Sequence, residues 1–117
     1  MTTQEVANRY IELAKEGKIV EIQQELFDEN VECIEPAHFP LPGAKGKEAV
    51  MARLLAWFEN IEQRHDFAIT EPVVMGEYFS FGMMVDLTLK GMGRVKTEEI
   101  CVYGVKDGKI ILEQFFF

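Results

Sequence analysis

The stretch EYFSFGMMVDLTLKGMGRVKTEEICVYGVKDGKIILEQFFF, residues 77–117, decides the fold. It holds three runs rich in β-branched and aromatic residues, separated by the Gly-Met-Gly of residues 91–93 and by Asp107-Gly108. An Asp-Gly pair between apolar runs is a strong signal for a tight β-hairpin. The preceding run HDFAITEPVVM, residues 65–75, predicts one more strand, with Gly76 as its turn. The second half of the chain therefore predicts four strands in an antiparallel meander.

The first half of the chain predicts three helices and one short strand. Residues 3–16 carry apolar side chains at helical spacing behind a capping box. A shorter helical pattern covers residues 19–27, and a third covers residues 47–62. The strand lies in NVECIEP, residues 30–36, and a loop rich in Pro and Gly follows it. Helices first and strands last predict a single α+β domain over residues 1–117, with three N-terminal helices packed on one face of a curved antiparallel sheet.

Charge and composition exclude several classes of partner. The 117 residues carry a net charge of −8, so nucleic acid and anionic membranes are poor partners. No apolar run approaches the roughly 20 residues that span a bilayer. The first twenty residues are too polar for a signal peptide, and we expect a cytoplasmic protein. Cys33 and Cys101 are expected to be reduced thiols in the core.

The longest predicted strand has two different faces. Because side chains alternate along a strand, its odd positions form an apolar ladder from Phe79 to Leu89, and its even positions form a mixed face from Tyr78 to Thr88. The chain also ends in three phenylalanines, and large exposed apolar patches are rare on monomers. We expect a homodimer that covers such a patch, unless the chain's own helices cover the last strand.

Several strings of the sequence resemble the NTF2-like superfamily, in its SnoaL-like and ketosteroid-isomerase-like branch. ANRYIELAKEGKIVEIQQELFDENVECIEP, residues 7–36, looks like the opening of such proteins, and GKEAV (46–50) and the closing DGKIILEQFF (107–116) fit the same pattern. The resemblance implies a cystatin-like cone, in which the helices close over a bent sheet around a ligand pocket and the outer sheet face forms a dimer. The mixed faces would then line the pocket, and the apolar ladder would meet the second subunit.

The resemblance also implies candidate catalytic residues. In ketosteroid isomerases a carboxylate at the end of the first strand moves the proton, and a helix tyrosine and a protonated acid on a later strand stabilise the oxyanion. Glu35 and Tyr10 match the first two positions. Cys101 stands where the later acid is expected, and a thiol is a weak donor. In the polyketide-cyclase branch the base lies on a later strand, and Glu113 is the candidate for it. The alternatives are a solvated Glu35 and a core Tyr10.

The mixed faces, the loop after the first strand and the third helix supply the residues expected to line the pocket. They are His38, Trp57, Met84, Asp86, Glu99, Cys101, Tyr103, Glu113 and Phe115. In the alternative interpretation His38 is an exposed loop residue, Trp57 and Met84 fill the core or an interface, and the acids lie in water or pair with Arg53 or Arg94. No metal site and no organic cofactor is expected, because metal-ligand spacing and phosphate-binding loops are missing.

Together these patterns predict a protein that binds a small apolar or amphipathic molecule. If it is an enzyme, we expect a cofactor-independent isomerase or cyclase type of reaction, in which Glu35 moves a proton alpha to a carbonyl and Tyr10 stabilises the enolate. The superfamily hosts isomerases, cyclases, hydratases, epoxide hydrolases and non-catalytic binders, so the fold does not fix the activity. The alternative is a non-catalytic ligand-binding or dimeric association module.

Overall fold

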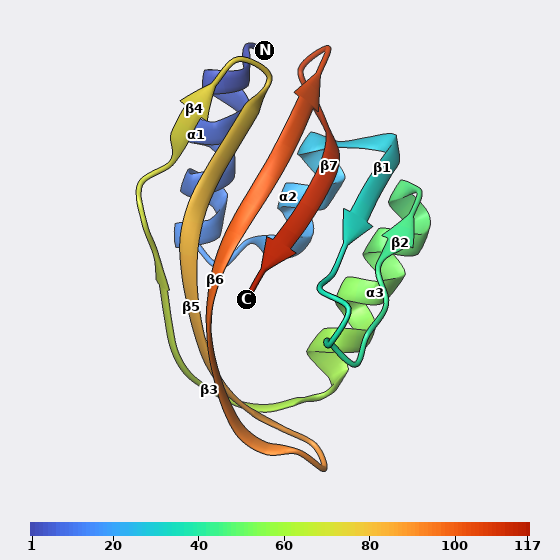
Figure 1. The fold of residues 1–117 in the computed structure, drawn as a ribbon, viewed down its shortest axis with the longest axis vertical. Coiled ribbons are helices and arrows are strands. Elements are labelled where there is room, and N and C mark those ends of the chain that lie inside the picture. The colour runs from blue at the N-terminus through green and yellow to red at the C-terminus, as the bar shows by residue number, and fades with distance from the viewer.

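Helices open the chain and a β-meander closes it, and the computed structural model describes all residues 1–117. The chain has three helices, and Figure 1 shows the helices on one side of a curved sheet. No helix combines the length with the apolar composition that a bilayer-spanning segment requires. The elements are α1 (Thr3–Lys15), α2 (Ile19–Leu26), β1 (Phe27–Ile34), β2 (Ala44–Lys45), α3 (Lys47–Glu59), β3 (Ile61–Ile69), β4 (Val73–Met75), β5 (Tyr78–Leu89), β6 (Gly93–Lys106) and β7 (Lys109–Phe116).

Local signals set the ends of the helices. The Thr2 hydroxyl accepts a hydrogen bond from the Glu5 backbone N–H at 3.1 Å, and the Glu5 carboxylate accepts one from the Thr2 backbone N–H at 2.8 Å, which confirms the capping box. Helix α2 ends at Leu26, and Phe27 is already extended, so β1 begins three residues earlier than predicted. Helix α3 ends at Glu59, and Ile61 opens β3 instead of extending the helix.

The sheet is mixed, which corrects the antiparallel sheet predicted from the sequence. Its strand order is β2-β1-β7-β6-β5-β3, and β4 also pairs with β5. The four pairings among β3, β4, β5, β6 and β7 are antiparallel as expected, but β1 pairs with β7 in parallel. The parallel pair joins strands from the two halves of the chain, and no turn signal links them. Local patterns therefore do not reveal it.

The run HDFAITEPVVM forms two strands rather than one. Strand β3 ends at Ile69 and β4 starts at Val73, and both pair with β5. The gap contains Pro72. Proline has no N–H to donate to a neighbouring strand, and it restricts the backbone angles of the preceding residue, Glu71. The proline therefore divides the predicted strand.

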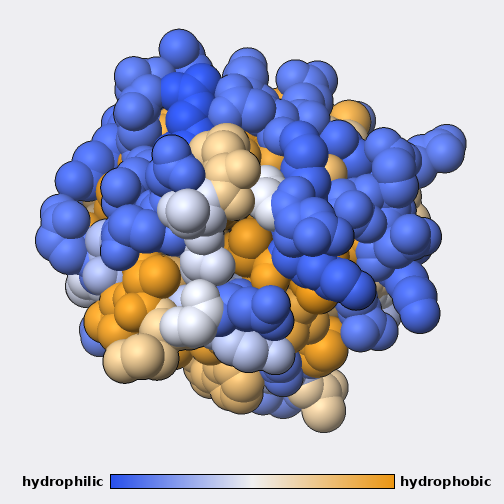
Figure 2. Space-filling view, turned by 90° about the horizontal axis from the view of Figure 1, so that it is seen from above, coloured by the Kyte–Doolittle hydropathy of each residue, from blue (hydrophilic) through white to orange (hydrophobic).

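The apolar ladder of β5 faces the helices, not a second subunit as the sequence analysis expected. Phe79 and Phe81 are buried, and their ring centroids lie 5.9 and 5.3 Å from that of Tyr10 on α1. The helices need a wide apolar surface to pack on, and only the odd face of β5 offers one. The mixed face is therefore the outer face. In Figure 2 hydrophobic residues show in the lower part, on the strand side, and the helix side is mainly hydrophilic.

Gly43 holds the loop after β1 close to that strand. A Cβ atom at this position would clash with the Cys33 carbonyl oxygen, which is backbone and cannot swing aside. We predict that Gly43→Ala lowers the free energy of unfolding by about 1–3 kcal/mol, because the overpacked loop must move away from β1. Urea unfolding measures the change.

Gly82→Ala is the matched control for this prediction. A Cβ atom there would meet the Thr70 side-chain methyl at 3.2 Å, and a side chain can shift by the small amount required. We expect a smaller loss than for Gly43→Ala. Equal losses would show that the contact between Gly43 and β1 does not hold the loop.

Candidate active site

Three side chains of adjacent strands, Cys33, Glu113 and Tyr103, stand next to one another inside the fold. The register places Glu113 of β7 opposite both Cys33 of β1 and Tyr103 of β6, and paired residues share a face. The Tyr103 ring stacks on Phe79 at 5.0 Å, so this face is the interior. The exposed fractions are only 2% for Cys33, 6% for Glu113 and 1% for Tyr103.

Glu113 has the most strongly shifted acid–base equilibrium among the interior glutamates. Burial raises the pKa of its carboxyl group, while hydrogen bonding from Cys33 and Tyr103 and the positive charge of Arg53 lower it, and the charge of Glu35 raises it again. The result is a pKa of about 7, against an ordinary value of 4.5. A carboxyl group with this pKa can both give and accept a proton near neutral pH.

Tyr10 approaches this group from helix α1. Its hydroxyl oxygen lies 2.6 Å from that of Tyr103, so one of the two hydroxyls donates a hydrogen bond to the other. Burial raises the pKa of both phenols well above the ordinary value of 10, which keeps them protonated. The negative charge of Glu113 raises the pKa of both phenols further. The structure therefore brings Tyr10 together with Tyr103 and Glu113.

Glu35 lies one residue beyond the end of β1, and its side chain is 6% exposed. Arg53 of α3 donates a hydrogen bond from Nη2 to Glu35 Oε2 at 2.5 Å and another from Nε to the Pro42 carbonyl oxygen at 2.9 Å. Burial raises the pKa of Glu35, the charge of Arg53 opposes this, and the charge of Glu99 adds to the rise. Glu35 is thus a buried, paired carboxylate and not the solvated residue of the alternative interpretation.

Glu99 and Cys101 lie on the same interior face of β6. They pair with Met83 and Phe81, which belong to the inward ladder of β5. Burial raises the pKa of Glu99, and the Thr97 hydroxyl donates a hydrogen bond to its Oε2 atom at 2.8 Å. Burial also raises the pKa of the Cys101 thiol, so Cys101 stays uncharged and can offer only a weak hydrogen bond.

Aromatic side chains gather near the end of β7. Phe39 lies between Trp57 and Phe117, with ring centroids 5.6 and 5.5 Å away. His38 is exposed and meets the Phe117 ring edge-on at 5.4 Å. Phe115 is opposite Cys101 in the register and packs against the core. The loop after β1, helix α3 and the C-terminus therefore share one apolar cluster.

Met84 and Asp86, which were also expected to line the pocket, lie on the face of β5 opposite to Phe79 and Phe81 and do not join the interior group. They pair with Glu98 and Lys96 on the outer face of β5. Asp86 accepts two hydrogen bonds from Arg94, at 3.0 and 2.9 Å, and these bonds lower its pKa. The alternative, pairing with Arg94, is thus correct for Asp86. The alternation of side chains defines two faces on each strand. The pairing register between β5 and β6 decides which face of β5 lies beside which face of β6.

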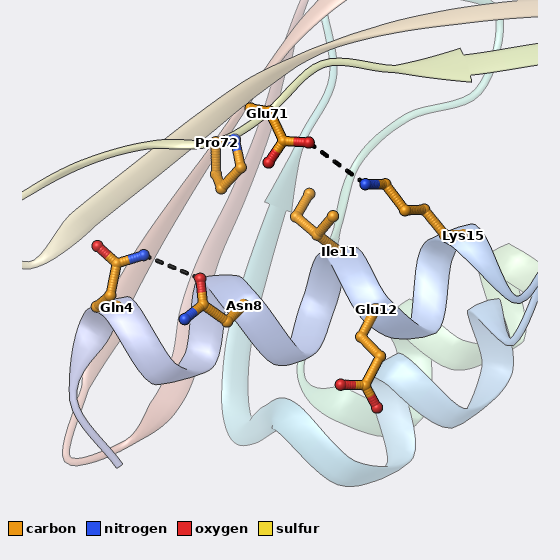
Figure 3. Close-up of a pocket in the computed structure, with 7 residues that line it drawn as sticks. All are labelled: Gln4, Asn8, Ile11, Glu12, Lys15, Glu71 and Pro72. Carbon is orange, nitrogen blue, oxygen red and sulfur yellow. Dashed lines mark hydrogen bonds and ion pairs between the residues drawn. The ribbon is translucent and has the colours of Figure 1, made fainter.

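A surface groove of about 400 Å³ lies between α1 and the connection from β3 to β4, as Figure 3 shows. Gln4 donates a hydrogen bond to Asn8 at 2.9 Å, and Lys15 forms an ion pair with Glu71 at 3.3 Å. A second groove of about 570 Å³ lies at the start of α3, next to Lys45 and Lys47. Neither of these two grooves contains a residue of the predicted site.

The model of the SnoaL-like domain matches residues 1–117, the whole chain. The chain belongs to the SnoaL-like family. A protein from Mesorhizobium loti, with the provisional description of a SnoaL-like polyketide cyclase, is 31% identical, with 100% of each chain covered and a TM-score of 0.94. No curated protein matches this sequence.

More distant solved structures show the same fold. An NTF2-like protein from Burkholderia pseudomallei is 13% identical, with a TM-score of 0.79 and coverage of 100% of this chain and 91% of its own. A protein with a cystatin-like fold from Xanthomonas campestris is 18% identical, with a TM-score of 0.76 and coverage of 99% and 90%. These likenesses confirm the predicted NTF2-like, cystatin-like cone.

The raised pKa of Glu113 makes the stability of this SnoaL-like domain depend on pH. The folded state binds the proton more tightly than the unfolded state, so the stabilising contribution is complete below pH 4.5 and is lost as the pH rises through 7. We predict that the unfolding free energy of the wild type, relative to Glu113→Gln, falls by roughly 3 kcal/mol over this range.

Urea unfolding of both proteins at a series of pH values measures this difference. The glutamine variant is the matched control, because it keeps the shape of the side chain and does not titrate. A difference that stays constant between pH 4.5 and 7 would show that Glu113 has an ordinary pKa.

Proposed function

We propose that this SnoaL-like protein is a cofactor-independent enzyme that moves a proton alpha to a carbonyl group of a small apolar or amphipathic molecule. The observation that carries the proposal is that three carboxyl groups face the interior, where burial raises the pKa of each. They belong to Glu35, Glu99 and Glu113. Buried acids are rare without a role or a partner, and only Glu35 is in an ion pair.

Glu113 is the better placed of the two candidate proton acceptors. Its carboxylate would take a proton from the carbon next to the substrate carbonyl, which leaves an enolate and a protonated Glu113. Returning that proton to another carbon completes an isomerisation. In a cyclisation the enolate carbon attacks a second carbonyl, and the alkoxide oxygen formed there takes the proton back from Glu113. Glu35, the acceptor predicted from the sequence, has one of its oxygens bound to Arg53.

The tyrosine pair supplies the donor that the enolate oxygen needs. Tyr10 and Tyr103 carry two hydroxyl protons. The bond between them uses one, and the other, which hydrogen-bonds Glu113, would turn to the substrate oxygen when the substrate binds. Loss of one strong oxyanion donor costs about 10²–10³ in rate. Tyr103 lies two residues beyond Cys101 on the same face of β6, and we propose that its hydroxyl replaces the acid that is missing at Cys101.

The apolar part of the substrate would lie against the aromatic cluster of Phe39, Trp57 and Phe117. These rings come from the loop, α3 and the chain end, close to where Arg53 of α3 holds Glu35. The description of the Mesorhizobium loti relative as a polyketide cyclase supports a substrate with carbonyl groups. No cofactor enters this reaction, because the carbonyl group itself holds the negative charge.

We predict that the wild-type protein exchanges the alpha protons of a ketone from a panel of cyclic ketones and diketones in deuterated water. Glu113→Gln should lower the exchange rate by about 10²–10⁴, because the amide cannot accept the proton. Proton NMR measures the exchange, and its rate should rise with pH through about 7, the pKa of Glu113.

Two variants complete this experiment. Glu35→Gln tests the acceptor predicted from the sequence, and Asp86→Asn on the outer face is the matched control, which should keep the wild-type rate. Full exchange by Glu113→Gln would remove Glu113 as the base. A loss with Glu35→Gln alone would return that role to Glu35.

A non-catalytic binding module is the second candidate. The observations that favour it are Cys101 in the place of an acid and the close packing of Tyr10 on Phe79, Phe81 and Tyr103. Such packing leaves the interior beside α1 filled by the protein's own rings. Ligand-induced rises in melting temperature without any proton exchange would support this function over the enzyme.

We also propose that the outer sheet face forms a homodimer. Tyr78, Ile100 and Phe116 lie on the three adjacent strands β5, β6 and β7 of this face and are 56%, 53% and 50% exposed. Ile100 and Phe116 are direct neighbours in the register. A second copy that presents the same patch would bury all of these side chains, which is the usual arrangement in symmetric dimers.

Sedimentation at micromolar concentration should therefore give twice the chain mass of 13.4 kDa. Ile100→Glu should give the monomer mass, because a charge at the centre of the patch would be buried without a partner. Met92→Glu, at an exposed position in the turn between β5 and β6, is the control and should remain a dimer. A monomeric wild type would contradict the proposal.

A further inference from the structure

Arg53 binds both ends of the loop that follows β1. Its Nη2 atom donates to Glu35 just before residues 36–41, and its Nε atom donates to the carbonyl oxygen of Pro42 just after them. The side chain of Arg53 is 18% exposed and that of Glu35 is 6% exposed, so this contact is shielded from water. A guanidinium group can make both bonds at once because its donors are held in one plane.

The loop held in this way carries part of the aromatic cluster. His38 and Phe39 lie between Glu35 and Pro42, and both contact Phe117 at the chain end. Phe39 also contacts Trp57, which lies one turn beyond Arg53 on α3. Arg53 and Trp57 therefore fix the same loop from the same helix, one through hydrogen bonds and the other through ring packing.

Arg53 also divides the two buried glutamates into a paired and an unpaired one. It forms an ion pair with Glu35, whereas Glu113 lies between Cys33 and Tyr103, which carry no charge. Two neighbouring carboxyl groups that share one cation repel each other's negative charge, so the group next to the cation is ionised first. The arrangement thus favours an ionised Glu35 beside a Glu113 that holds or releases a proton.

We propose that Arg53 is a positioning residue, which fixes Glu35 as a paired carboxylate and thereby leaves Glu113 as the group that exchanges the proton. This assignment rests on the proposed proton-transfer function and deepens it. Arg53 need not touch the substrate, because it acts through Glu35 and through the loop that carries the aromatic cluster.

Several ionisable groups face the two glutamates, and the experiment has to account for each of them. Arg53 of α3 and Glu99 of β6 act on Glu35. The groups that shift the pKa of Glu113 are Cys33 of β1, Glu35 just after β1, Arg53 of α3 and Tyr103 of β6. The charge of Glu113 in turn raises the pKa of the Tyr10 phenol on α1. Only Arg53 among them is positively charged, so its removal has a predictable sign.

Carbon-13 NMR titration of the glutamate carboxyl groups in the free protein tests the proposal without any substrate. Glu35 should titrate about one to three pH units higher in Arg53→Gln than in the wild type, because an adjacent opposite charge lowers a carboxyl pKa by about that much. Arg53→Lys is the matched control. It keeps the charge, so the titration of Glu35 should stay near that of the wild type. An unchanged Glu35 titration in Arg53→Gln would overturn the proposal.

Glu35→Gln provides a second test that does not depend on whether Arg53→Gln folds. Loss of the Glu35 charge removes a repulsion from Glu113 and leaves Arg53 free to approach it, so Glu113 should titrate at lower pH than in the wild type. A Glu113 titration that stays in place or moves to higher pH would also overturn the proposal.

The ketone exchange reaction provides the kinetic readout. The midpoint of its pH profile should move upward in Arg53→Gln and return toward the wild-type value in Arg53→Lys. A purely structural role would lower the rate in both variants and leave the midpoint in place, which would contradict the proposal. If no ketone is exchanged by the wild type, the proposed function fails, while the titrations still decide the role of Arg53.

Discussion

The packing of Tyr10 against Phe79, Phe81 and Tyr103 is the contact on which the rest of this structure depends. It decides which face of the curved sheet is covered by helices and which face stays open. Once that face is chosen, strand alternation turns Glu99 of β6 and Glu113 of β7 inward and leaves an apolar patch outside. One cluster of rings thus determines both the acid chemistry of the interior and the surface available for association.

The elements of the fold could be predicted where short-range signals specify them. The capping box at Thr2, the Asp107-Gly108 turn and the helical patterns all correspond to structure. The sequence also shows that β5 has two faces, but not which face is inside, since that depends on packing against distant helices. The sequence therefore groups Met84 and Asp86 with the inward residues of β6 and β7, whereas the register places them on the opposite face. The parallel pairing of β1 was not predicted, because no local sequence pattern indicates it.

The sequence predicted which residues face the interior of the candidate site better than it predicted the hydrogen bonds and ion pairs between them. Glu35, Tyr10 and Glu113 all lie inside the fold, yet Tyr10 is linked to Tyr103 and Glu113, while Glu35 is bound by Arg53. Arg53 follows Val50 by three residues and precedes Trp57 by four, so its spacing places it at the edge of the inward stripe of α3, but spacing does not show which carboxylate it binds. Glu35 and Glu113 differ in how close they lie to the guanidinium group of Arg53. The spacing of residues along the chain does not predict a distance between segments that are far apart in the sequence.

The parallel pairing of β1 with β7 has a consequence for how the protein is made. Residue 33 pairs with residue 113, so the two strands meet only after almost the entire chain has been synthesised. Contacts between such remote segments close large loops and slow the folding of a domain. During translation the first strand therefore leaves the ribosome without its partner. The nascent chain would hold an unpaired β-edge until β7 emerges, a state that chaperones commonly protect.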